Sequence, residues 1–334
     1  MESYQKLNSV CLLILTAIAL AIIFAMAKVI LIPFTLSIFI WLVYSPVITF
    51  LQEKLKLPRT LALAGSLIAF VSIFVLLSFL ITSSIDTFIK GADQYKDKLD
   101  ALTLQVSAIS IKLGFDVKSG ELQDLLQKFP IMSFVKSLSG SMLGFVSNMF
   151  LVIIFSLFLL TGESLSQHKI GILEEIKSNT RKYVSNKLVL SLATGLVTYV
   201  ILKLFSVEMA FMFAMFTFLL NFIPNIGSAI AVLLPLPVLL LQFDFGYQIV
   251  IVLALLLAIQ TFFGNILEPK MMGESMGLHP VTILLFLTFW GFIWGVTGMF
   301  LSVPITATLK IVFSKFEITR PISELFAGNL VTTK

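Results

Sequence analysis

Charged residues are scarce in this sequence. They make up 12% of its 334 residues, whereas they make up about a quarter of a typical soluble domain. Hydrophobic residues account for 58%, and the mean hydropathy is +1.03. This composition excludes an ordinary soluble domain. It predicts an all-α, polytopic membrane protein, which has the lipid bilayer as its first partner.

Residues that serve catalysis or bind metals are also few. The single cysteine, Cys11, excludes an intrachain disulfide. The two histidines, His168 and His279, lack the His-Glu-x-x-His spacing of a zinc protease, and neither has an evident serine partner. No Gly-x-x-x-x-Gly-Lys-Ser/Thr loop for ATP occurs. We therefore expect no enzyme activity, no metal and no cofactor beyond a coupling ion, H⁺ or Na⁺.

Basic residues exceed acidic ones, giving a net charge of +5, but they lie in connectors between apolar segments. No basic stripe is interleaved with aromatic residues, so the charge does not indicate a nucleic-acid partner. Basic short loops favour the cytoplasm. The connector at Arg59, residues 163–187 and the tail from Lys310 are expected there, which places the charge-balanced residues 83–139 outside.

Eight apolar segments are candidates to cross a bilayer, which takes about 20 residues. They lie at about 8–27, 29–50, 61–81, 142–161, 188–205, 209–241, 249–267 and 281–313. We predict three regions: residues 1–82 with the first three transmembrane segments, an extracytoplasmic helical hairpin at 83–139, and a transport core at 140–334. Glycines and Pro304 interrupt the last segment, which predicts a broken or re-entrant helix.

A heptad pattern marks the extramembrane region. Apolar residues recur at its a and d positions over about four repeats, as in a coiled coil, at Ile85, Phe88, Ala92, Tyr95, Leu99, Leu102, Val106, Ile109 and Leu113. Such a helix would extend the third segment out of the membrane. It is either half of a hairpin on the bilayer surface or an oligomerisation seam, and its regularity favours the seam and a homo-oligomer.

The sixth segment contains a polar, helix-breaking stretch. Pro224 and Gly227 are expected to break or bend a helix at membrane depth. Because freed amides cannot face lipid, a broken helix is expected to line a cavity, together with Asn221 and Asn225. The alternative is a kinked helix whose two asparagines, four apart on one face, bond a neighbouring helix. If the break instead turns the chain back as a hairpin, the later topology inverts.

A second polar group ends the seventh segment. Gln260, Asn265 and Glu268 close an apolar helix that Pro269 stops. An ionised carboxylate in a membrane is costly, so Glu268 is expected to have water, a cation or Lys270 nearby. It either caps the connector or carries a proton or cation in the same cavity as the asparagines. His279 is either a cap or a group that titrates near neutral pH.

These residues together resemble a known family. The stretches Ile223 to Gly227, Glu268 to Pro280, Gly295 to Gly298 and Val303-Pro304 are similar to the signature of the autoinducer-2 exporter family of bacterial permeases. Asn225 and Ser228 depart from the resemblance, because many members have an aromatic residue and a proline at these positions. The resemblance implies a multi-pass transporter of the bacterial inner membrane and a homo-oligomer. Members are linked to autoinducer-2 export in quorum sensing or to exchange of sodium or lithium for protons.

The leading hypothesis is therefore secondary transport of a small polar solute or a monovalent cation by alternating access. The candidate pathway comprises Asn221, Pro224, Asn225, Gly227, Gln260, Asn265, Glu268, Pro269 and His279. Two alternatives remain at this point: an oligomeric passive channel or exporter, and a membrane scaffold assembled through the heptad helix.

Overall fold

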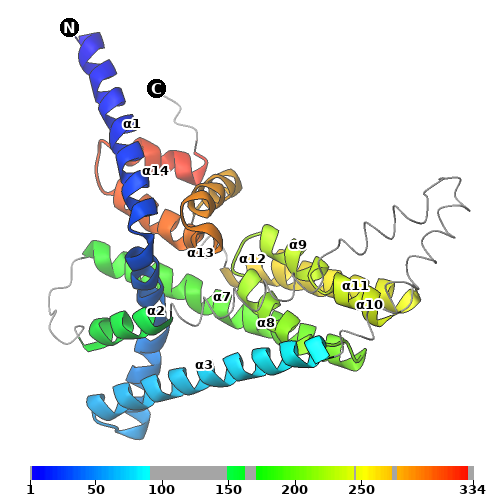
Figure 1. The fold of residues 1–334 in the computed structure, drawn as a ribbon. Coiled ribbons are helices and arrows are strands. Elements are labelled where there is room, and N and C mark those ends of the chain that lie inside the picture. The colour runs from blue at the N-terminus through cyan, green and yellow to red at the C-terminus, as the bar shows by residue number, and fades with distance from the viewer. Residues whose placement is uncertain (1, 91–148, 162–170, 244–245, 273–276, 330–334) are drawn as a thin grey trace, which may run out of the picture. The chain divides into compact units, whose positions relative to one another are not determined.

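The computed structural model describes residues 2–90, 149–161, 171–243, 246–272 and 277–329. Every regular element in these ranges is helical, in agreement with the predicted all-α class (Figure 1). The described chain forms two compact units. The terminal unit comprises residues 1–63, 148–185 and 274–334, and the central unit comprises residues 64–147 and 186–273.

The terminal unit is built around the long helix α13 (Pro280–Ser314). The helices α1 (Glu2–Met26) and α2 (Lys28–Leu55) both pack against it, and so does α14 (Arg320–Ala327). A bend of 88° separates α1 from α2, at the boundary expected between the first two apolar segments. The indole nitrogen of Trp294 donates a hydrogen bond to the Phe24 carbonyl at 2.9 Å, which ties α13 to α1. The helix Met149–Thr161 and the first half of α7 (Gly171–Leu204) complete the unit.

The central unit contains most of α3 (Arg59–Lys90) and the second half of α7. The remaining elements are α8 (Ala210–Leu220), α9 (Ile226–Leu233), α10 (Leu236–Gln242), α11 (Tyr247–Gln260), the π-helix η2 (Thr261–Leu267) and α12 (Glu268–Met272). Buried aliphatic and aromatic side chains from α7, α8, α10 and α11 form its core, including Leu202, Phe213, Leu239 and Val252. Buried polar side chains, among them Ser191, Asn221 and Gln260, lie in the same unit, and each needs a hydrogen-bond partner to offset the cost of burial.

The predicted boundaries agree at the start of the seventh segment and are wrong at its end and at the fifth segment. Helix α11 begins at Tyr247, close to the predicted 249, but η2 and α12 continue it through Pro269 to Met272, so Pro269 does not stop it. Residues 163–187 were expected to be a connector, but α7 begins at Gly171 and continues through Lys187 without a break. Lysine, arginine and glutamate have high intrinsic helix propensity, so a stretch rich in them can extend a membrane helix.

Eight separate crossings are not confirmed. Among the described residues, α7, Tyr247–Met271 and α13 are long and apolar enough to cross a membrane, and the bent α1–α2 pair is a fourth candidate. Helix α3 continues unbroken to Lys90, beyond the predicted end of the third segment at residue 81. The heptad positions from Ala92 to Leu113 lie outside the described residues, so the seam stays a prediction.

The predicted break at Pro224 reverses the chain. Helices α8 and α9 pack against each other, as Figure 1 shows. A Cβ atom added at Gly227 would lie 1.8 Å from the carbonyl oxygen of Leu220. In a continuous helix, residues seven apart would be about 10 Å apart along the axis. Only a hairpin brings these backbones together, and only glycine fits at the contact.

A second reversal interrupts α13, where the sequence predicts a broken or re-entrant helix. Gly295 has φ 63° and ψ −144°, which is not helical. A Cβ atom added at Gly298 would lie 1.9 Å from the carbonyl oxygen of Trp290, eight residues earlier. Each unit therefore contains one apolar helical hairpin with a glycine packed at its tip.

Candidate functional site

A buried ion pair lies in the central unit. The Nζ atom of Lys187 on α7 donates a hydrogen bond to Oε1 of Glu268 at a distance of 2.5 Å. The lysine side chain is 1% exposed and the glutamate side chain is 23% exposed. The pair therefore has a closed side at the ammonium and an open side at the carboxylate. The sequence suggested Lys270 as a partner for Glu268, but Lys270 is exposed and Lys187 takes that place.

Lys187 begins a polar stripe along α7. Ser191, Thr194 and Thr198 follow it at spacings of four, three and four residues, which places all four on one helix face. All four side chains are buried, with exposures between 0% and 2%. Lys187 was expected in a connector and the stripe was not predicted, although the spacing of its four residues is visible in the sequence.

Asn221 joins the stripe from the α8–α9 hairpin. Its side-chain amide donates a hydrogen bond to Oγ of Ser191 at 3.1 Å, and the side chain is 4% exposed. The alternative in which an asparagine bonds a neighbouring helix is therefore realised at Asn221. Two contacts, Lys187 with Glu268 and Ser191 with Asn221, thus link successive turns of α7 to two different elements of the unit.

Asn225 does not share a face with Asn221. It is exposed at the tip of the hairpin with φ 59° and ψ −52°, which is close to a classic γ-turn, a rare and strained backbone conformation. Its carbonyl oxygen accepts a hydrogen bond from the Ser228 hydroxyl at 2.8 Å. The Pro224 carbonyl accepts another from the amide of Ile226. The two positions that depart from the family pattern, Asn225 and Ser228, are therefore direct partners.

The π-helix η2 leads directly into Glu268. Single π-turns within α-helices are frequent at functional sites, because the extra residue per turn redirects the side chains that follow. Asn265 in η2 and Pro269 in α12 are both exposed. The Asn186 side chain donates a hydrogen bond to the Met271 carbonyl at 3.0 Å. Residues 186 and 187 of α7 therefore hold both ends of α12.

Gln260, at the end of α11, has an unpaired buried atom. The side chain is 6% exposed, and Oε1 makes no hydrogen bond to any residue that the structure describes. Buried polar atoms are nearly always paired, so each exception is a candidate for contact with water or a ligand. Gln260 belongs to the same unit as Asn221 and Glu268.

His279 belongs to the terminal unit, and the structure does not bring it together with the other predicted pathway residues. It is the N-cap of α13, where Nδ1 accepts a hydrogen bond from the Val281 amide at 3.3 Å. Its own amide donates to the Phe326 carbonyl at 2.9 Å, which fixes the end of α14 beside it. This geometry corresponds to the capping alternative.

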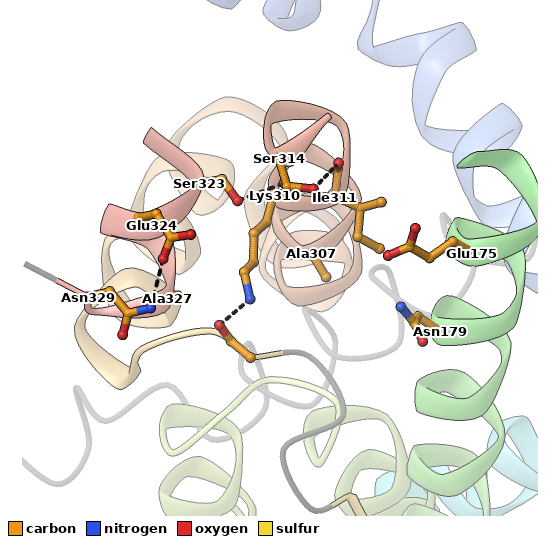
Figure 2. A pocket seen from close by; sticks show the side chains of 11 residues that line it. Glu175, Asn179, Ala307, Lys310, Ile311, Ser314, Ser323, Glu324, Ala327 and Asn329 are labelled. Atoms are coloured by element: carbon orange, nitrogen blue, oxygen red, sulfur yellow. Dashed lines mark hydrogen bonds between the residues drawn. The ribbon is translucent and has the colours of Figure 1, made fainter. Parts of the chain in front are cut away.

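A polar cavity of about 420 Å³ lies within the terminal unit. Figure 2 shows Glu175 and Asn179 entering it from α7, and Lys310 extending from α13 to the Gly277 carbonyl at 2.6 Å. Other polar groups of the lining are also paired, for example Glu324 with Asn329 at 2.7 Å. Several polar groups of this cavity are therefore already paired within the terminal unit.

Comparison with known proteins decides the family. Residues 12–318, almost the entire chain, match the family described as AI-2E family transporter. The chain belongs to the AI-2E family. The resemblance drawn from the sequence motifs is thereby confirmed.

Three relatives of this AI-2E family chain cover most of it. AI-2 transport protein TqsA of Escherichia coli (strain K12) is 29% identical over 296 residues, which is 85% of this chain and 86% of the relative. Two proteins named "Putative transport protein" come from Haemophilus influenzae and Borreliella burgdorferi. The Haemophilus influenzae protein is 30% identical over 303 residues, which is 86% of both chains. The Borreliella burgdorferi protein is 29% identical over 326 residues, which is 92% of this chain and 87% of the relative. Family and relatives support a membrane transporter.

All residues of the candidate pathway except His279 lie in the central unit: Asn221, Pro224, Asn225, Gly227, Gln260, Asn265, Glu268 and Pro269. Side-chain hydrogen bonds join two of them, Asn221 and Glu268, to α7. The contact residues on α7, Lys187 and Ser191, complete the candidate site.

Proposed function

We propose that this chain is a secondary transporter in which the polar face of α7 in the central unit lines the pathway. The observation that carries the proposal is the Lys187–Glu268 ion pair at the start of a buried polar stripe, in the same unit as a large apolar core. Ion pairs are expensive in such surroundings and are often neutral or worse for stability than apolar packing. Ionisable residues in membrane segments are therefore a pointer to transport.

The α8–α9 hairpin supplies the second element. Irregular backbone at membrane depth is tolerated where it lines a cavity or is buried in protein. The tip carries exposed Asn225 and half-buried Ser228, and Asn221, where α8 enters the turn, is bonded to Ser191. Alternating access by movement of the hairpin relative to α7 would expose Asn221 and Glu268 to one side at a time.

For the substrate we propose a small polar solute or a monovalent cation. Asn221 and Gln260 offer amide donors and acceptors, and Glu268 offers one negative charge. The name of the relative TqsA supports an AI-2-like solute, whereas the open carboxylate supports exchange of Na⁺ or Li⁺ for protons. The departures at Asn225 and Ser228 lie at the hairpin tip, so the substrate of relatives does not transfer automatically.

The remaining features are proposals on the same basis. Eight hydrophobic segments with re-entrant hairpins, a multi-pass position in the bacterial inner membrane, and H⁺ or Na⁺ as coupling ion agree with the apolar composition and the family. A homo-oligomer assembled through the heptad from Ile85 to Leu113 agrees with the sequence pattern.

Flux in proteoliposomes tests the proposal. Purified protein is reconstituted, and entry of labelled solute or sodium is recorded with and without imposed pH and sodium gradients. A coupled transporter concentrates its substrate against a gradient when the coupling gradient is imposed. Flux that follows only the gradient of the solute would instead identify a passive exporter, and no flux for any solute would reject transport by the isolated chain. Glu268→Gln should abolish coupling, whereas the exposed control Glu317→Gln should not.

A further inference from the structure

The Lys187–Glu268 pair has an asymmetry beyond its role as a polar lining. The ammonium of Lys187 carries three N–H donors, and only one of them is donated, to Glu268, within the part of the chain that the structure describes. The carboxylate uses only Oε1 in this contact, so Oε2 has no hydrogen-bond partner among the described residues. The buried ammonium thus relies on the carboxylate for charge compensation, while Oε2 of the carboxylate remains available to another ligand.

We propose that Glu268 is a monovalent-cation site that exchanges the Lys187 ammonium for a cation from solution, with release of the lysine proton. The inference rests on the proposed transport function and specifies how its coupling works. The carboxylate already holds a single positive charge, so an ion of the same charge is its natural competitor. Its partly exposed side gives that ion a route to Oε2.

Charge balance explains why a proton leaves. When a cation M⁺ binds the Glu268 carboxylate, the carboxylate no longer compensates the ammonium, which is 1% exposed and would be an unpaired buried charge. Loss of one proton from Nζ to solvent leaves a neutral amine and a cation–carboxylate pair. The net charge of the pair is zero before and after, and one proton is released for one cation bound. Lysine suits this role because its ammonium can lose a proton, unlike a guanidinium.

No other described charged side chain of the surrounding elements replaces either partner. Helices α8 and α11 contain no charged residue, and the other charged residue of α12, Lys270, is exposed. On α7, Lys203 is exposed and more than four turns away. The titratable residue one turn before Lys187 is Tyr183, which is buried and is not a charged group near neutral pH. The exchange therefore concerns the two groups of the pair.

Proton release by purified protein is the test. The full chain in detergent, in weak buffer with a pH-sensitive dye, receives sodium, lithium or potassium chloride, with N-methylglucamine chloride as the bulky-cation control. Wild type should release about one proton per chain with at least one of the small cations, as expected when ligand groups give up protons on cation binding. The readout does not require transport.

Lys187→Arg separates exchange from structure. Arginine preserves the positive charge and the ion pair but does not deprotonate. We expect a folded protein whose proton release is at least tenfold lower, while Lys203→Arg, an exposed position on the same helix, releases as much as wild type. If Lys187→Arg does not fold, the neutral pair Lys187→Met with Glu268→Gln takes its place, and it should also release none.

Equal release by wild type and by either Lys187 variant would overturn the proposal, and so would absence of release from wild type with all three cations. A failure of the exchange can be distinguished from a failure of the proposed transport function. Proteoliposomes that transport while wild type releases no proton would reject the exchange and retain the transporter. Normal release without flux of any solute would retain the exchange site and reject transport.

Discussion

Nζ of Lys187 and Oε1 of Glu268 lie 2.5 Å apart, although 81 positions separate the two residues in the sequence. The contact joins the middle of α7 to the first residue after the π-helix. Because the lysine is sealed and the glutamate is partly open, either partner alone would be left with an uncompensated charge. The following predictions start from this pair and from the hairpin beside it.

Removing one partner of the pair should destabilise the protein more than removing both. Lys187→Met or Glu268→Gln alone leaves one group of the pair without compensation, and breaking a buried pair in this way costs about 3–5 kcal/mol. When Lys187 is replaced, the remaining Glu268 carboxylate can still contact solvent, so the loss of unfolding free energy should be at the lower end of this range. The double variant should recover much of the loss. Thermal unfolding of the four proteins in one detergent gives the double-mutant cycle. Additive effects would mean that the pair contributes no coupling.

Gly227→Ala should open the α8–α9 hairpin. The added methyl group would lie 1.8 Å from the Leu220 carbonyl oxygen, and backbone cannot move aside as a flexible side chain can. We expect a loss of about 1–3 kcal/mol or more, and loss of flux.

The matched control for the hairpin is Gly65→Ala. Gly65 is in α3, and nothing lies within 4 Å of its Cβ position. Alanine should stabilise the helix there by about 0.5–1 kcal/mol. Equal melting temperatures for the Gly227 and Gly65 variants would contradict the close approach at the hairpin.

Asn221→Leu should cost stability because it leaves the Ser191 hydroxyl without its partner in a buried position. An unsatisfied buried polar group costs about 1–3 kcal/mol. Combining Asn221→Leu with Ser191→Ala removes both polar groups and should restore part of the lost stability. If the Asn221 amide contacts the substrate, the double variant should still lack flux. Melting curves and flux on the same preparations check this. Full flux in the double variant would show that Asn221 has only a structural role.

Stability should depend on pH through Glu208, which lies in the connector between α7 and α8. Burial raises the pKa of this carboxyl above its ordinary value of 4.5. The folded state therefore holds the proton more tightly than the unfolded state, so the contribution is fully present below the unfolded pKa and is lost as pH rises through the folded pKa. Melting temperatures across pH 4 to 8 should fall less steeply for Glu208→Gln than for wild type. Parallel curves would refute this assignment.

Local signals made part of the fold predictable. Pro224 marks a break because proline removes an amide donor, and Gly295 marks the other because glycine adopts positive φ. Both interruptions occur where the sequence places them. The sequence left open whether the first break bends or reverses the chain, since that depends on how closely Gly227 packs against Leu220.

The site was less predictable because its contacts are not local. Glu268 was identified as a residue that needs compensation, but its partner lies far away in the sequence, in a stretch that resembles an ordinary basic connector. Only the spacing of Lys187 with Ser191, Thr194 and Thr198 distinguishes that lysine from its exposed neighbours. The π-helix before Glu268 has no signal in the sequence that we can identify.

The most direct test of the transport site is the internal pH of proteoliposomes when sodium is added outside. With wild type we expect the internal pH to rise as sodium enters in exchange for protons. With Glu268→Gln the internal pH should stay constant, while the protein remains folded. An identical rise in the wild type and the variant would contradict a role for Glu268 in coupling and would leave the ion pair as a structural feature.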